Sequence, residues 1–125
     1  GIRRRQLLIL VHFMSRDCVR EDILRRGLLP QHRWDRNGDR TTASRTDIME
    51  FNELFANDDT LDQEIHNCTK DGLIKKSTLE DGTQCYTLKG GLDSCLRHYY
   101  THQLWVALFA LAAYIYPRDH ALEQS

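Results

Sequence analysis

The first third of the chain carries hydrophobic residues at the spacing of two consecutive helices. Residues 6–14 (QLLILVHFM) are apolar on most sides, which predicts a helix or strand buried nearly all round, and the capping residues that follow favour a helix. A second helix is expected over residues 18–26, with Gly27 placed to end it. Its apolar side chains share one face at Val19, Ile23 and Leu24.

The middle of the chain begins with a polar segment that has no hydrophobic period. Residues 28–45 are rich in Arg, Asp, Thr and Gly, which predicts a long loop. A third helix is expected from Thr46, and the Asn-Asp-Asp cluster at residues 57–59 is expected to end it. Thr60 opens a capping box for a fourth helix, which Gly72 is placed to stop.

After the fourth helix the pattern changes from helical to extended. Residues 73–78 and 84–88 are rich in β-favouring residue types, and the Asp-Gly pair between them supplies the positive-φ positions of a tight hairpin turn. A final helical region is expected over residues 92–116, either continuous or broken near Thr101.

The order of these elements is that of a winged helix-turn-helix domain. Four helices are followed by a two-stranded wing. The expected fold class is therefore mainly α with a small β-hairpin. Residues 1–100 are expected to form the winged-helix domain, including the polar loop at residues 28–45. Residues 101–125 are expected to form a C-terminal helix that completes the core or leads to a following helical module.

Length and charge narrow the functional classes. The 125 residues allow one compact domain, and 41% hydrophobic with 28% charged residues is ordinary for a globular protein. The net charge of -1 hides a gradient: residues 1–45 carry 11 basic and 5 acidic side chains, whereas residues 46–81 carry 3 and 10. Such a bipolar chain suits docking against another protein better than catalysis.

The cysteines and the longest apolar run indicate a cytoplasmic protein. The four cysteines include no C-x-x-C pair, so reduced thiols are the default expectation. The longest apolar run, residues 104–116, is shorter than the roughly 20 residues needed to cross a bilayer, and no membrane contact is expected. The chain begins with Gly and has no signal pattern, which suggests a piece of a longer protein.

Two stretches of the sequence resemble a known family. They are LLILVHFMSRDCVREDILRRGL and DIMEFNELFANDDTLDQEIHNCTKDGLIKKSTLEDGTQCYTL. Together they resemble the winged-helix segment that follows the nucleotide-binding module in STAND NTPases, the NB-ARC or NACHT proteins of fungal NLR-like type. The resemblance implies a regulatory domain that packs on a neighbouring nucleotide-binding domain and rearranges when nucleotide is exchanged.

The resemblance also implies a role for one lysine. Lys89 stands where family members often carry a His that approaches the nucleotide phosphate, and a lysine can meet a phosphate as a point charge. The chain has no G-x-x-x-x-G-K-[ST] loop, so any NTPase would lie before Gly1. Neither a nucleophile elbow nor a catalytic cysteine context is present, and we expect no enzymatic activity and no cofactor.

Tryptophans mark two candidate protein contacts. Trp34, flanked by Arg33 and Arg36, has the composition of an interface anchor, although folding back onto the core would explain it equally well. On the last helix, Trp105 and Phe109 belong to a broad apolar stripe that either completes the core or contacts another module.

Nucleic-acid binding is the alternative function, because winged helices commonly place the helix before the wing in the major groove. The side chains that would attract phosphates are Arg3, Arg4, Arg5, Lys75 and Lys76. The helix expected over residues 60–71 carries three carboxylates and a single lysine. Phosphates would be repelled there, so this alternative is disfavoured.

One candidate metal site comes from residue spacing. Cys95, His98 and His102 fall at i, i+3 and i+7, which would align three ligands on one face of a continuous helix, with Cys68 or His66 as a fourth. A core cysteine and surface histidines explain the same residues without a metal. The metal hypothesis therefore depends on an unbroken helix.

Overall fold

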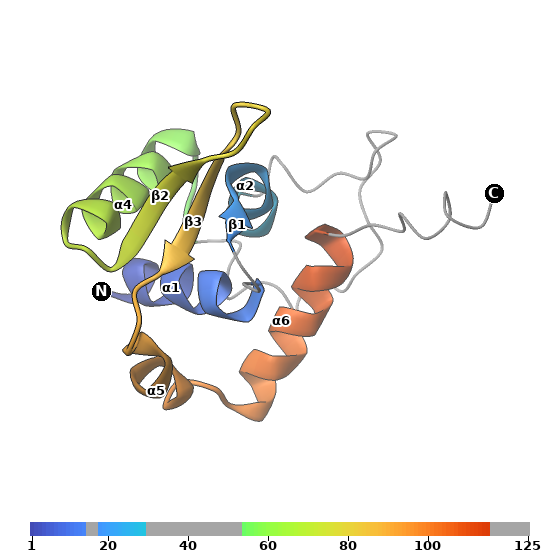
Figure 1. The fold of residues 1–125 in the computed structure, drawn as a ribbon. Helices are drawn as coiled ribbons and strands as arrows, with labels where there is room; N and C mark the ends of the chain where they lie inside the picture. Colours follow the sequence, from blue (N-terminus) through green and yellow to red (C-terminus); the bar gives the residue numbers. More distant parts are fainter. Residues whose placement is uncertain (15–17, 30–53, 116–125) are drawn as a thin grey trace.

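The computed structural model describes residues 1–14, 18–29 and 54–115, with side chains up to residue 112. These residues are mostly helical and include a small antiparallel sheet, which confirms the expected class of mainly α with a small β part (Figure 1). The helices are α1 (Ile2–Met14), α2 (Glu21–Leu28), α4 (Asp58–Lys70), α5 (Leu92–Arg97) and α6 (His102–Ile115). The strands are β1 (Val19–Arg20), β2 (Ile74–Thr78) and β3 (Gln84–Leu88).

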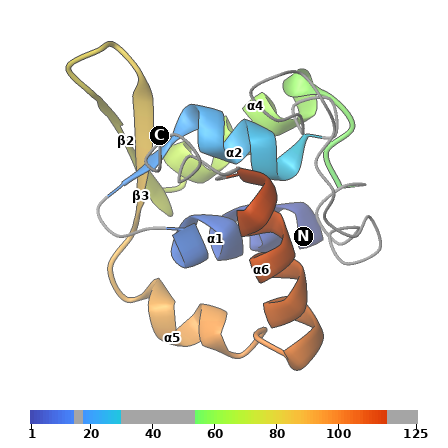
Figure 2. The same cartoon turned by 90° about the vertical axis from the view of Figure 1, so that its right-hand side faces the viewer.

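Helix α1 is the centre of the core. Every residue from Gln6 to Val11 is buried, which accounts for the apolar run that has no polar face. The helix packs against α2, α4, α5, α6 and β3. Figures 1 and 2 show α4 and α6 on opposite sides of it. A single hydrophobic cluster therefore includes residues of every helix and strand described.

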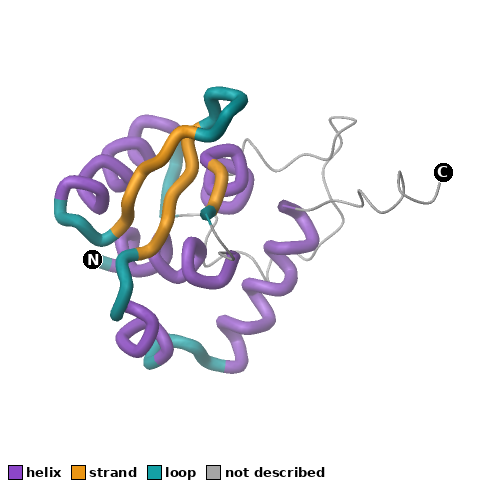
Figure 3. Tube along the Cα trace, in the orientation of Figure 1, coloured by secondary structure: helices purple, strands orange, loops and turns teal. Residues whose placement is uncertain are grey.

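The predicted hairpin is confirmed almost to the residue. Strands β2 and β3 pair antiparallel, with Ile74 opposite Leu88 and Thr78 opposite Gln84 (Figure 3). Gly82 in the turn has φ of 88°, a conformation that glycine adopts without strain, and its N–H donates to the carbonyl of Leu79 at 2.9 Å. The Asp-Gly signal therefore identified the turn correctly.

The start of the predicted second helix is wrong. Val19 and Arg20 form β1, which pairs antiparallel with β3 and gives the sheet the order β1-β3-β2. Helix α2 begins at Glu21 and continues through the buried Gly27 to Leu28, so that glycine does not end it. The strand depends on hydrogen bonds to residues far along the chain, which local periodicity does not reveal.

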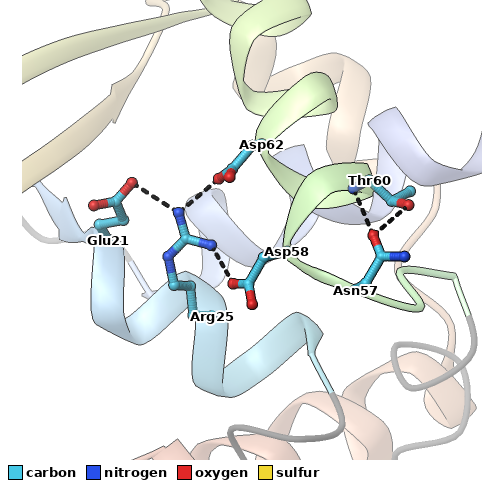
Figure 4. Close-up of polar contacts among 6 residues, drawn as sticks. All are labelled: Glu21, Arg25, Asn57, Asp58, Thr60 and Asp62. Atoms are coloured by element: carbon cyan, nitrogen blue, oxygen red, sulfur yellow. Dashed lines mark hydrogen bonds and ion pairs between the residues drawn. The ribbon is translucent and has the colours of Figure 1, made fainter.

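The Asn-Asp-Asp cluster was also misread: it begins a helix. Asn57 is the N-cap of α4, and its side-chain oxygen accepts hydrogen bonds from the N–H and the hydroxyl of Thr60, each at 2.9 Å (Figure 4). Gly72, with φ of 75°, follows the end of α4 as predicted. The predicted loop at residues 28–45 and the helix from Thr46 fall almost wholly outside the described residues.

The final helical region is broken rather than continuous. Helix α5 ends at Arg97, and the Thr101 hydroxyl accepts a hydrogen bond from the N–H of Leu104 at 3.0 Å, which caps the start of α6. The break near Thr101 is therefore confirmed. None of the helices in the described part of the chain is both long enough and apolar enough to cross a bilayer.

Candidate functional site

Four aromatic side chains from three parts of the chain form one cluster beside α6. We call Phe13, Tyr100, Trp105 and Phe109 the aromatic surface. The ring of Phe13 packs edge-on against Trp105 and Phe109, with centroid distances of 5.9 and 5.6 Å. Trp105 lies 4.8 Å from Tyr100 and stacks on Phe109 at 5.8 Å. These separations are typical of favourable aromatic pairs.

The aromatic surface remains open to solvent. Trp105 is 43% and Phe109 is 62% exposed, although both side chains are large and apolar. Val106 beside them is also exposed. Contiguous exposed apolar residues of this size mark interaction sites in soluble proteins. Trp105 and Phe109, predicted from the sequence as contact residues, are therefore exposed, and their role in a contact stays a prediction.

The sequence of α6 explains why two stripes of apolar residues arise on one helix. Leu104, Leu108 and Leu111 recur at helical spacing and are buried. Trp105 and Phe109 are also four residues apart and form the adjoining stripe. Helix α6 packs on α1 and α2, with its leucine stripe buried, and the aromatic stripe is covered only in part, by Phe13 of α1.

A polar contact at the end of α1 holds Tyr100 in place. The ring of His12 shares hydrogen bonds with the Tyr100 hydroxyl, at 2.8 Å, and with the Asp93 carboxylate. Burial, with a smaller effect from the charge of Asp93, raises the pKa of Tyr100 to about 12, so its hydroxyl stays protonated at neutral pH. The Arg97 side chain donates to Asp93 at 2.7 Å and, with His12, lowers the pKa of that carboxyl.

The amino-terminal arginines, assigned above to nucleic acid, all have partners within the domain. Arg3 donates to the carbonyl oxygen of Leu54 at 2.8 Å. Arg4 forms ion pairs with two carboxylates of the α4 region, Glu64 at 3.1 Å and Asp71 at 2.8 Å. The guanidinium of Arg5 lies 4.5 Å from the ring centroid of Tyr99, a cation–π contact.

The carboxylates of α4 are likewise used inside the molecule. Arg25 of α2 reaches Asp58 at 2.7 Å and Asp62 at 2.6 Å on α4, and Glu21 on its own helix at 3.1 Å (Figure 4). Asp58 and Asp62 therefore connect α4 to α2 through Arg25. Glu64 and Asp71 connect the same helix region to α1 through Arg4. The sequence showed these acids only as a repulsive surface, because the pairing depends on tertiary packing.

The candidate lysines are exposed on and after the hairpin. Lys75 and Lys76 lie on β2, the edge strand of the described sheet, and Lys89 directly follows β3. Among the described residues, none forms an ion pair with these three lysines. The N–H of Lys89 donates to the carbonyl of Leu73 at 2.9 Å, which fixes its backbone beside the hairpin while the side chain stays in solvent.

The proposed metal ligands do not share a helical face. Cys95 lies in α5, whereas His98 and His102 lie on either side of the break between α5 and α6. The i, i+3, i+7 geometry therefore does not form. Within the residues described, no group of three His, Cys, Asp or Glu side chains is arranged to hold a metal ion. Trp34, Arg33 and Arg36 lie outside these residues.

Sequence reasoning missed part of the aromatic surface. Phe13 was assigned to the core with the rest of its apolar run, and Tyr100 and His12 were not singled out. The tandem tyrosines just before α6 were the available signal.

Comparisons with protein-family models, curated proteins and solved structures gave no match to this chain.

Proposed function

We propose that the protein is a non-catalytic regulatory domain of winged-helix type, which packs on the nucleotide-binding module of a STAND-type NTPase and transmits its nucleotide state. The element order supports the fold assignment: a helix, a short strand and further helices precede a hairpin. The sheet order β1-β3-β2 adds the short first strand that winged domains pair with the hairpin.

The aromatic surface is the observation that carries the proposed contact. Trp is among the residues that contribute most to protein interfaces, and here it is surrounded by other aromatic rings on a helix anchored in the core. Burying Trp105 and Phe109 against a partner removes apolar area that the isolated domain leaves in water.

The charge distribution favours a protein partner over nucleic acid. Stacked aromatic rings can bind bases, but such sites also need free cations to follow the phosphate backbone. Arg5 on α1 and Arg97 on α5 are instead engaged by Tyr99 and Asp93. Lys75, Lys76 and Lys89 remain as exposed cations, on and just after the hairpin. Three lysines supply few of the phosphate contacts that duplex binding needs.

The mechanism in this proposal is conformational. Because the leucine stripe of α6 is buried in the same core as α1, the aromatic surface moves with the whole domain. Nucleotide exchange in the partner would then repack a rigid-body interface between two arrangements, with no chemical step in this chain. Lys89, exposed beside the hairpin, is the proposed residue to approach the nucleotide phosphate.

The proposal is tested first on the reading frame that encodes the chain, which should also encode a phosphate-loop module before Gly1. Binding of the purified module to this domain is then measured by calorimetry. Trp105→Ala and Phe109→Ala should each weaken binding about 10-fold or more, the size expected of interface anchors. Lys75→Ala, on an exposed edge strand, is the matched control and should bind as the wild type does.

Two outcomes would count against the proposal. A reading frame without a phosphate-loop module removes the partner. Tight binding of the domain to duplex DNA, weakening steeply as salt is raised and abolished by Lys75→Ala with Lys76→Ala, would instead identify a nucleic-acid-binding domain.

A further inference from the structure

Two cysteines lie close together in the sheet, one just before β1 and one on β3. Cys18 directly precedes β1, and Arg20 on that strand is paired with Cys85 of β3. Because side chains alternate along extended backbone, Cys18 is on the same face as Arg20 and hence on the same face as Cys85. Cys18 is therefore the diagonal neighbour of Cys85 across the pair of strands.

The two thiols lie near each other on this face of the sheet. A side-chain hydrogen bond with Cys18, followed by burial, raises the pKa of Cys85. The neighbouring Cys18 side chain therefore favours the protonated form of Cys85.

The two thiols differ in their access to solvent. Cys18 is half-buried, whereas Cys85 is 1% exposed. A small reagent from solvent therefore reaches the Cys18 sulfur first. The buried Cys85 thiol can react only with the oxidised side chain of Cys18. Cys68 lies buried on α4, where burial raises its pKa to about 12, and Cys95 is alone on the exposed side of α5.

We propose that Cys18 and Cys85 are a redox-active pair that closes to a disulfide when the protein meets hydrogen peroxide. The Cys18 sulfur attacks one peroxide oxygen, the O–O bond breaks, and the products are a sulfenic acid on Cys18 and one water. The Cys85 sulfur then attacks the sulfenic sulfur, and the hydroxyl leaves as a second water with the Cys85 proton. Two thiols are oxidised and one peroxide is reduced to two waters.

The bond joins parts of the domain that are distant in sequence. It ties the residue that precedes β1 and α2 to the central strand of the sheet, and so fixes the hairpin against the helical layer. Closing such a long loop restricts the unfolded chain, so the oxidised protein should melt at a higher temperature than the reduced protein.

The test oxidises the reduced protein with one equivalent of hydrogen peroxide, unfolds it in denaturant, blocks the remaining thiols by alkylation, and maps the peptides by mass spectrometry. The expected result is a loss of about 2 Da, as two thiols become a disulfide, with Cys18 linked to Cys85 while Cys68 and Cys95 are alkylated. Cys85→Ala should leave Cys18 as a sulfenic acid that dimedone labels. Cys95→Ser is the control and should still form the bond.

The wild-type protein alone can overturn the proposal, which removes any dependence on how the variants fold. If Cys18 and Cys85 both remain alkylatable while Cys95 is oxidised, peroxide reactivity follows exposure and the pair has no special chemistry. Equal dimedone labelling of Cys18 and Cys95 in Cys85→Ala would lead to the same conclusion.

Discussion

Helices α4 and α6 flank the central helix and present opposite kinds of surface. On the α4 side, arginines of α1 and α2 form ion pairs with carboxylates of the α4 region, so these carboxylates are paired within the domain. On the α6 side, the rings of Trp105 and Phe109 stack on each other and remain exposed. The exposed apolar surface of the domain therefore lies on α6, whereas α4 presents charged side chains that are paired within the domain.

The comparison also extends to how the two helices are attached. Ion pairs between partly exposed side chains contribute little each, typically up to about 1 kcal/mol. Buried apolar side chains contribute more, because each is wholly removed from water, and both helices have them: Leu61 and Ile65 on α4, and Leu104, Leu108 and Leu111 on α6. Both helices are therefore attached through the same apolar core, and the ion pairs add to that attachment on the α4 side.

The largest expected effect is the difference in stability lost when the leucine stripe and the aromatic stripe of α6 are each truncated. Leu108→Ala, at a fully buried position, should lower the free energy of unfolding by about 3 kcal/mol because it leaves a cavity in the core. Phe109→Ala, on the next residue, should cost less than about 1 kcal/mol because its ring is 62% exposed. Urea unfolding of both variants measures the difference. Equal losses would mean that the aromatic stripe is part of the core.

The next effect concerns the attachment of α4. Arg25→Met should lower the free energy of unfolding by about 1–2 kcal/mol, because it leaves Asp58, Asp62 and Glu21 close together without their shared cation. The loss should shrink as salt is raised. Arg20→Met, which removes a more exposed arginine, is the matched control and should cost less. If both variants lost the same stability and the loss did not change with salt, the ion pairs of Arg25 would not be what attaches α4 to α2.

A smaller effect appears as acid sensitivity on the α6 side. The Arg97 and His12 side chains lower the pKa of Asp93 in the folded protein, below its ordinary value of 3.8. The contribution of this carboxylate to stability is therefore complete above that value and is lost as the pH falls through the lowered folded value. Thermal unfolding from about pH 7 to about pH 3 should show the advantage of wild type over Asp93→Asn shrinking at the acidic end. A constant advantage would show that charge is not involved.

The smallest effect is expected on the hairpin. Lys76→Gln should change the free energy of unfolding by less than about 0.5 kcal/mol, because the side chain is exposed on an edge strand. It should also leave binding to the nucleotide-binding module unchanged. A loss of binding as large as that of Trp105→Ala would move the contact from α6 to the hairpin.

Local chemistry predicted the hairpin well and the helix ends poorly. The limits of β3 and the turn at Gly82 follow from residue types that act on their immediate neighbours. The two-residue strand β1 was missed, since it exists only through its pairing with Cys85 and Tyr86. Asn57 was misassigned because asparagine and aspartate both end helices and begin them.

The candidate site was predictable only in part, for a similar reason. The apolar pattern of α6 identified Trp105 and Phe109, but not which of its residues face the core. The same limitation made Arg4 a candidate for phosphate binding, because its ion pairs with Glu64 and Asp71 join residues that are 60 and 67 positions apart. Spacing along one helix likewise suggested a metal site at Cys95, His98 and His102, which the break before α6 removes.

The central position of α1 has a consequence for biosynthesis. Among the described elements this helix is synthesised first, yet its packing partners extend to α6, which begins only at His102. During synthesis the run from Leu7 to Val11 is therefore covered step by step, and its native packing is incomplete until α6 has emerged. A nascent chain with such a run is a natural client for chaperones that hold short apolar segments, and the core is expected to close only once α6 is available.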